Sequence, residues 1–140
     1  MADPEVSPTP PPRVLVAEDD AALRRLLELR LRMDGFDVTT AQDGQEAIDA
    51  VLAADVKPDI LVCDIMMPRV SGLNVCRELR GRAASHSLPI ILLSAHNLDP
   101  TIEAVLELGN IGFMNKPFNA TELRERIREV LAQRAGAKVE

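Results

Sequence analysis

Residues 60–72 have the sequence ILVCDIMMPRVSG, which carries the strongest indication of the fold of this chain. The first four are apolar and Pro58 precedes them, a pattern that is typical of a short strand buried on both faces of a sheet. Asp64 follows directly, so a carboxylate stands at the end of the strand. We therefore expect an interior strand with an acidic group at its carboxyl end.

Apolar runs of this kind alternate with segments of helical period along the rest of the chain. Five strands are predicted, at residues 14–17, 37–41, 59–63, 89–94 and 112–115. Each is followed by a predicted helix, at residues 21–33, 45–54, 73–82, 101–108 and 120–134. In the first helix the apolar stripe is formed by Leu23, Leu26, Leu27 and Leu31.

Turn and capping residues support these boundaries. Gly35 follows the first helix, Gly109 follows the fourth, and Asn119 with Glu122 can form a capping box at the fifth. Strict alternation of strand and helix predicts parallel strands joined by right-handed crossovers, with helices on both faces. The predicted fold class is a doubly wound α/β fold, (βα)5 and flavodoxin-like, with a five-stranded parallel sheet in the order 2-1-3-4-5.

The composition limits the class of protein. With 140 residues, 46% of them hydrophobic, the chain has the size of one domain with a core. A net charge of −6 and 2% aromatic residues argue against a basic or stacking surface for nucleic acid. No apolar run approaches the roughly 20 residues of a membrane helix. We expect a soluble protein that binds neither nucleic acid nor membrane directly, with Cys63 and Cys76 as reduced core thiols.

The ends of the chain are expected to lie outside the domain. Residues 1–12 lack the features of a secretory signal, which favours a cytoplasmic protein, and they hold five of the ten prolines. We expect a disordered, Pro-rich tail there, with a Pro-rich ligand for a partner domain as the alternative. Residues 13–134 form the predicted domain and residues 135–140 a C-terminal tail.

Acidic side chains follow two of the predicted strands. Glu18, Asp19 and Asp20 come after the first strand and Asp64 after the third, and the predicted order makes these strands neighbours at the switch point of the sheet. Carboxylates that share a pocket raise one another's pKa, and a divalent cation such as Mg²⁺, which takes oxygen ligands, relieves their repulsion. A Mg²⁺ site is therefore predicted at this edge.

Two more polar side chains are predicted at the same edge of the sheet. Ser94 ends the fourth strand and Lys116 follows the fifth. A hydroxyl group and a positive charge are suited to hold the oxygens of a phosphoryl group beside the cation.

Four motifs together resemble the receiver domain of two-component response regulators, such as the single-domain chemotaxis regulators. The motifs are VLVAEDD (14–20), ILVCDIMMPRVSG (60–72), IILLSAH (90–96) and FMNKPF (113–118). They occur in the order of the family, and the resemblance covers residues 13 to about 134.

The resemblance implies a role for each acidic residue. Asp64 would be the phosphoacceptor, although as an isolated residue it would be read as a carboxylate that caps a loop. Mg²⁺, with Mn²⁺ as a possible substitute, would be held by Glu18, Asp19, Asp64 and the backbone carbonyl of Met66, with Asp19 as a direct ligand and Glu18 acting through water. Asp20 matches no ligand position, and we expect it to cap the first helix.

The resemblance also implies a switch. Ser94 and Lys116 would bind the phosphoryl group, and Phe113 would rotate inward as Ser94 moves, with an ordinary core residue as the alternative for Phe113. Because Phe113 has no hydroxyl group to bond the loop after the fourth strand, the switch is expected to rely on packing. The Lys116–Pro117 bond resembles a cis peptide of the family.

The implied chemistry is in-line transfer of a phosphoryl group from a phosphohistidine to Asp64. The resulting acyl phosphate would then hydrolyse at the same site. Met66 is expected to limit the approach of water and so lengthen the phosphorylated lifetime, and His96 is a candidate base with an ordinary loop residue as the alternative. The chain would thus be a signalling phosphoacceptor and not an enzyme acting on other molecules.

The resemblance names partners by class. A sensor histidine kinase or a phosphotransfer protein would donate the phosphoryl group, and an effector protein would bind the face formed by the fourth helix, fifth strand and fifth helix. Ile111 and Gly112 stand where regulators with a DNA-binding domain often carry an acidic pair, which puts a salt-bridged dimer in doubt. Ile111 is a candidate for an apolar docking face, with a singly exposed apolar residue as the alternative. Both a monomer and a phosphorylation-dependent dimer stay open.

Two other functions are alternatives to the phosphorylated switch, a docking module and a phosphatase. A docking module that works without phosphorylation would lack some of the acids, the hydroxyl or the lysine, and this chain has them all, with Glu18 in place of an aspartate as the one departure. A Mg²⁺-dependent phosphatase with an aspartyl nucleophile would need a second aspartate at position 66, which is a methionine.

Overall fold

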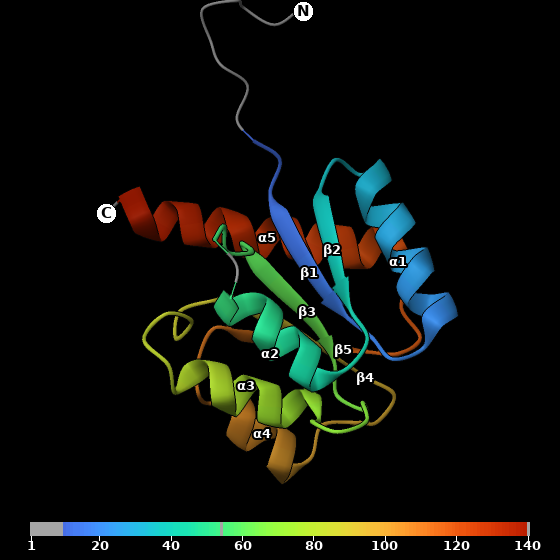
Figure 1. Ribbon diagram of the computed structural model, residues 1–140, viewed down its shortest axis with the longest axis vertical. Coiled ribbons are helices and arrows are strands. Elements are labelled where there is room, and N and C mark those ends of the chain that lie inside the picture. The colour runs from blue at the N-terminus through green and yellow to red at the C-terminus, as the bar shows by residue number, and fades with distance from the viewer. Residues whose placement is uncertain (1–9, 54, 140) are drawn as a thin grey trace, which may run out of the picture.

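The computed structural model describes residues 10–53 and 55–139, with the side chains of 10–53 and 55–134. Strands and helices alternate along the described chain in the order β1 (Arg13–Ala17), α1 (Ala21–Met33), β2 (Asp37–Ala41), α2 (Gly44–Ala53), β3 (Ile60–Asp64), α3 (Gly72–Arg80), β4 (Ile90–Ser94), α4 (Pro100–Leu106), β5 (Ile111–Asn115) and α5 (Ala120–Val139). The strands form one parallel sheet in the order β2-β1-β3-β4-β5, which confirms the predicted fold class (Figure 1).

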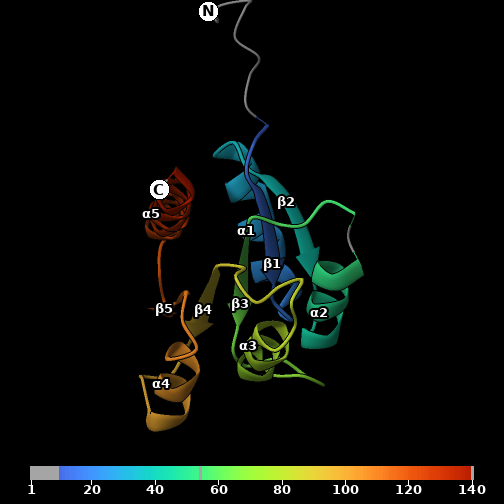
Figure 2. The ribbon, with the colours of Figure 1, turned by 90° about the vertical axis from the view of Figure 1, so that its left-hand side faces the viewer.

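Helices cover both faces of this sheet. Alternate residues of a strand point to opposite faces, so Val14 and Val16 pack under α1 and α5, whereas Leu15 and Ala17 pack under α2, α3 and α4. Figure 2 shows α5 and α2 on opposite sides of the strands. The three inner strands are almost wholly buried, as their continuous apolar runs predicted.

The predicted caps and turns are present. Asp20 caps α1, accepting hydrogen bonds from the backbone N–H groups of Ala22 and Leu23. At the start of α5 the Asn119 Oδ1 atom accepts a bond of 2.8 Å from the Glu122 N–H. Gly35 and Gly109 both have a φ of +95°, a conformation that favours glycine and ends the preceding helices.

Several predicted details differ from the structure. Most element boundaries shift by one or two residues, and α5 continues past residue 134, where a tail was expected, to Val139. The stretch from 135 to 138 reads AGAK, in which Ala and Lys favour a helix and Gly136 disfavours one, and no proline stops it. Leu26 was wrongly placed on the buried stripe, because it is 61% exposed while Leu27 and Leu31 are 2% and 0% exposed. Residues four apart lie along one face of a helix, and Leu26 is turned about 100° away from Leu27.

Part of the expected N-terminal tail pairs with the sheet, and the two cysteines lie in the core. Residues 1–9 of the expected tail lie outside the described residues, but the Pro12 carbonyl accepts a bond of 2.9 Å from the Asp37 N–H and so extends the pairing of β1 with β2. Cys63 and Cys76 are free and buried, as predicted, and burial raises the pKa of Cys76 to about 12. In the described part of the chain, no helix is long and apolar enough to cross a membrane.

The topology places the site. β1 lies between β2 and β3, and the connections that leave β1 and β3 run to opposite faces, since α1 covers one face and α3 the other. A crevice therefore opens beyond the carboxyl ends of β1 and β3, where ligands of such sheets bind.

Candidate functional site

Three carboxylates meet at this crevice. Glu18 and Asp19 follow β1, Asp64 ends β3, and one oxygen atom of each lies within 4.8 Å of the others. Glu18 and Asp64 are only 1% and 4% exposed, whereas Asp19 is exposed. The structure thus brings together three of the four acidic side chains predicted at this edge, while the fourth, Asp20, caps α1.

Lys116 supplies the positive charge of the pocket. Its Nζ atom lies 3.0 Å from Glu18 Oε1 and 3.2 Å from Asp64 Oδ1. The lysine comes from the end of β5, and the following Lys116–Pro117 peptide bond is cis, as the resemblance implied. Two of the three carboxylates therefore share one ammonium group.

Burial and the close spacing of the charges shift the pKa values of Glu18, Asp64 and Lys116. Burial is the largest influence on Asp64 and Glu18 and raises the pKa of both carboxyls, although the neighbouring Lys116 opposes the rise. Burial also lowers the pKa of Lys116, but its hydrogen bond to Glu18 and the charges of Asp64 and Glu18 outweigh burial, so the pKa of Lys116 is raised overall. The positive charge of Lys116 therefore does not fully offset the effect of burial on the pKa of Glu18 and Asp64.

The backbone around the acids is fixed by specific contacts. Arg24, on the first turn of α1, donates a bond of 2.8 Å from Nη1 to the Glu18 carbonyl, while Glu18 Oε2 accepts one of 3.2 Å from the Asp20 N–H. On the other side, Gly72 packs against the carbonyl of Asp64, where any Cβ atom would clash. These contacts hold the turns that carry Glu18 and Asp64.

The donor set fits a hard divalent cation. Three carboxylates offer oxygen atoms within one small space, and oxygen is the ligand that Mg²⁺ prefers. Among the described residues, neither cysteine belongs to this cluster of possible ligands, because both are buried in the core under α2, α3 and α4.

Ser94 is buried at the end of β4, and its hydroxyl group is turned toward the following loop. The Oγ atom donates a bond of 3.0 Å to the His96 carbonyl and accepts one of 2.9 Å from the His96 N–H. The side chain of His96 is exposed in that loop. Phe113 is half-buried and packs against the core under α2, α3 and α4. Met66, two residues after Asp64, has a 59% exposed side chain.

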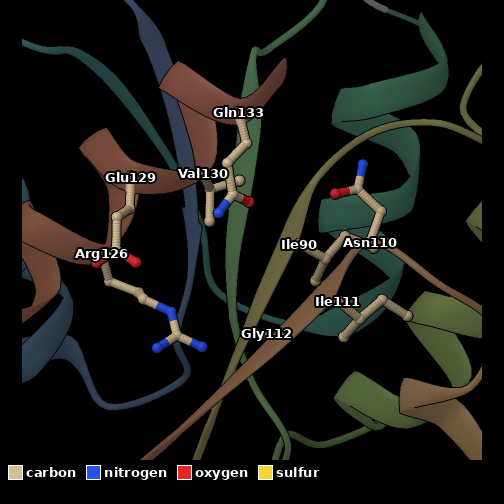
Figure 3. Close-up of a pocket in the computed structure, with 8 residues that line it drawn as sticks. All are labelled: Ile90, Asn110, Ile111, Gly112, Arg126, Glu129, Val130 and Gln133. Atoms are coloured by element: carbon tan, nitrogen blue, oxygen red, sulfur yellow. The ribbon is translucent and has the colours of Figure 1, made fainter. Parts of the chain in front are cut away.

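A separate hollow lies at the opposite end of the sheet, beside the amino ends of β4 and β5. Its volume is about 310 Å³, and Figure 3 shows Arg126, Glu129 and Gln133 of α5 on one side with Ile90, Asn110 and Ile111 on the other. Ile111 is half-buried and packs against the core. The hollow contains none of the predicted site residues.

Two residues near the site were missed by the sequence analysis. Arg24 holds the Glu18 carbonyl, and Asn115 donates a bond of 2.9 Å from Nδ2 to the His96 carbonyl. The only signals were positional, since Arg24 lies in the first helix beside the acids and Asn115 directly precedes Lys116.

The protein is thus a doubly wound α/β domain that carries carboxylates and a lysine together at the switch point of its parallel sheet. Residues 14–128 match the family model of the response regulator receiver domain, and the chain belongs to this family.

Known proteins agree with this assignment. The chain is 43% identical over 121 residues to Response regulator MprA of Mycolicibacterium vanbaalenii, an alignment that covers 86% of this chain and 51% of that protein. The chain thus spans about half the length of the curated relatives it matches. It is 30% identical to TrrA of Thermotoga maritima, solved in complex with Mg²⁺ and BeF, with a TM-score of 0.74 over 85% of this chain and 98% of that one. A receiver domain protein of Methanospirillum hungatei shares the fold, with a TM-score of 0.82 at 20% identity over 91% and 98% of the two chains.

Proposed function

We propose that this chain is a phosphorylation-dependent signalling switch in which Asp64 accepts a phosphoryl group. The observation that carries the proposal is the contact of 3.2 Å between Asp64 Oδ1 and Lys116 Nζ, inside a pocket that holds two more carboxylates. A buried carboxylate beside a cation is a suitable nucleophile for phosphorus, and the cation offsets charge on the incoming group.

The transfer step forms one bond and breaks another. An Oδ atom of Asp64 bonds to phosphorus while the bond from phosphorus to the donor's imidazole nitrogen breaks, and the electron pair of that bond stays with the imidazole. Lys116 offsets charge on the phosphoryl oxygens throughout. Hydrolysis removes the group, since a water oxygen bonds to phosphorus while the bond from phosphorus to Asp64 breaks; Asp64 leaves as a carboxylate, and the water gives up a proton to the solvent.

Mg²⁺, or Mn²⁺ in its place, is the proposed metal. Asp19 would bind it directly because its carboxylate is exposed beside the other two acids. Glu18 already accepts hydrogen bonds from Lys116 and from the Asp20 N–H and would act through water. Asp64 and the Met66 carbonyl would complete the protein ligands. When bound, the ion supplies further positive charge for the phosphoryl oxygens.

The switch would couple the pocket to the loop after β4. Ser94 would turn its hydroxyl group from His96 toward a phosphoryl oxygen, and Phe113 would move into the space that this leaves. Met66 would shield the acyl phosphate from water. His96 carries an exposed side chain in the loop, which supports the loop role over that of a base.

The proposed partners follow from the family. A sensor histidine kinase or a phosphotransfer protein in the cytoplasm would donate the phosphoryl group, and an effector would bind the α4–β5–α5 face. That face carries five exposed glutamates, Glu103, Glu107, Glu122, Glu125 and Glu129. Their charge favours an effector with a basic surface. With Ile111 and Gly112 in place of an acidic pair, we propose a monomer, or a dimer formed on phosphorylation.

Intact mass after incubation with acetyl phosphate tests the proposal. The wild type is expected to gain the mass of one phosphoryl group with Mg²⁺ present, and to lose this gain with EDTA. Asp64→Asn should show no gain, and Asp49→Asn, which changes an exposed aspartate on α2, should behave like the wild type. A folded wild type without any gain would contradict the proposed function.

A further inference from the structure

We infer that Asn115 is a positioning residue of the switch, which ties the loop after β4 to β5 and thereby holds the Ser94 hydroxyl group turned away from Asp64. The inference rests on the proposed function of Asp64. Asn115 directly precedes Lys116 in the chain, but its side chain bonds the His96 carbonyl and not the acidic pocket.

Three hydrogen bonds meet at the backbone of His96. Asn115 Nδ2 donates to the His96 carbonyl at 2.9 Å, Ser94 Oγ donates to the same carbonyl at 3.0 Å, and the His96 N–H donates to Ser94 Oγ at 2.9 Å. A carbonyl oxygen accepts two hydrogen bonds, so both positions on the His96 carbonyl are filled. Ser94 and Asn115 thus hold one backbone oxygen between them.

The register of the sheet explains how Asn115 reaches this loop. Ser94 and Asn115 are paired across β4 and β5, and the Lys116 N–H donates a bond of 2.7 Å to the Ser94 carbonyl. The backbone therefore places the Asn115 side chain beside the first residues after β4. Lys116, one residue further, reaches Glu18 and Asp64 instead.

Little else holds this part of the loop. Residues 95–99 are exposed, and the next hydrogen bonds along the described chain belong to the start of α4, where the Asp99 side chain accepts from the Ile102 N–H. The side chain of Phe113, also on β5, has no polar atom that could bond the loop. Among the described residues, Asn115 is thus the side chain of β5 that bonds the loop.

These hydrogen bonds predict in which direction the loss of the Asn115 amide would shift the conformation of the loop after β4. To reach a phosphoryl oxygen, Ser94 must give up its two bonds to His96, and the loop moves with it. Asn115 keeps the His96 carbonyl against β5 and so favours the present position of the loop. Removal of its amide should shift the equilibrium toward the state in which Ser94 faces Asp64.

Binding of beryllofluoride with Mg²⁺, which stands in for a phosphoryl group, tests the inference by ¹⁹F NMR titration. Asn115→Ala and the nearly isosteric Asn115→Leu should both bind beryllofluoride about three- to tenfold more tightly than the wild type, the effect of one lost hydrogen bond. Asn97→Ala removes an exposed amide from the same loop and should leave the affinity unchanged. In a Ser94→Ala background, Asn115→Ala should have no effect on the affinity.

A second measurement needs no bound ligand. Hydrogen exchange of the His96 amide, whose N–H is bonded to Ser94 Oγ, should be faster in Asn115→Ala than in Asn97→Ala. A wild type that does not bind beryllofluoride would contradict the proposed function. The exchange rates would then still show whether Asn115 holds the loop after β4 in place. Equal affinity and equal exchange in the wild type and both Asn115 variants would overturn the inference.

Discussion

The Nζ atom of Lys116 lies 3.2 Å from Asp64 Oδ1, although the two residues come from the ends of β5 and β3 and β4 lies between these strands. The lysine therefore reaches across the edge of the sheet to the acid. Its second contact, 3.0 Å to Glu18 Oε1, makes the ammonium the centre of the pocket. This placement explains how buried acids persist beside each other, and it yields two predictions on stability.

Lys116→Met should destabilise the protein by about 1–3 kcal/mol at pH 7, because two buried carboxylates lose their counter-ion. The loss should shrink as the pH falls, since Glu18 and Asp64 then take up protons and no longer need the ammonium. Urea denaturation at pH 7 and at acidic pH measures both values. An equal loss at both pH values would show that Lys116 acts by packing instead.

Asp64→Asn should raise the free energy of unfolding at pH 7 in the absence of divalent cations, because it removes a buried carboxylate whose ionised form is disfavoured in the folded state. The pKa of Asp64 is raised in the folded state, mainly by burial, so its ionised form costs stability at every pH above that raised pKa. The cost disappears as the pH falls through the raised pKa toward the usual range of an aspartate. The gain of the variant should therefore vanish at low pH, and a variant that is less stable at pH 7 would contradict the account.

Met66→Asn should shorten the lifetime of the phosphorylated protein several-fold. A polar amide at this exposed position, two residues after Asp64, would admit or orient water where a thioether excludes it. Loss of the phosphoryl mass over time measures the lifetime. Met33→Asn, the same change at an 83% exposed position on α1, is the matched control and should leave the lifetime unaltered. Equal lifetimes for Met66→Asn and the wild type would remove the shielding role.

Gly72→Ala should destabilise the fold by about 2–4 kcal/mol, because the new Cβ atom would clash with the carbonyl of Asp64 and force the loop away from β3. Gly81→Ala is the control, since its Cβ atom would lie 3.5 Å from the nearest atom, the Arg77 carbonyl oxygen, at a residue with helical φ and ψ. That control should be neutral or stabilising by about 0.5 kcal/mol. Thermal and urea denaturation compare the two variants.

The strand order and the composition of the pocket could be predicted because each depends on residue type and place in the chain. Apolar runs define the inner strands, and acids or a lysine at strand ends must meet at one edge of a parallel sheet. The prediction for Leu26 was wrong because an apolar residue beside a helical stripe looks the same in sequence whether it faces the core or water.

Hydrogen bonds from side chains to backbone carbonyls could not be predicted from the sequence. The bonds of Arg24 to Glu18 and of Asn115 to His96 end on carbonyl oxygens, which every residue has, so no residue type marks the acceptor. The rotamer of Ser94 could not be predicted either, because the same hydroxyl group can turn toward the loop or toward the pocket.

Chemical mapping of the modified residue would show whether Asp64 is the phosphoacceptor. Reduction with borohydride converts an aspartyl phosphate to homoserine, and peptide mass spectrometry then locates the residue that carried the phosphoryl group. After incubation with acetyl phosphate and Mg²⁺, homoserine should appear at position 64 and at no other acidic position. Homoserine at Asp19 or at a surface aspartate, with Asp64 unmodified, would contradict the account.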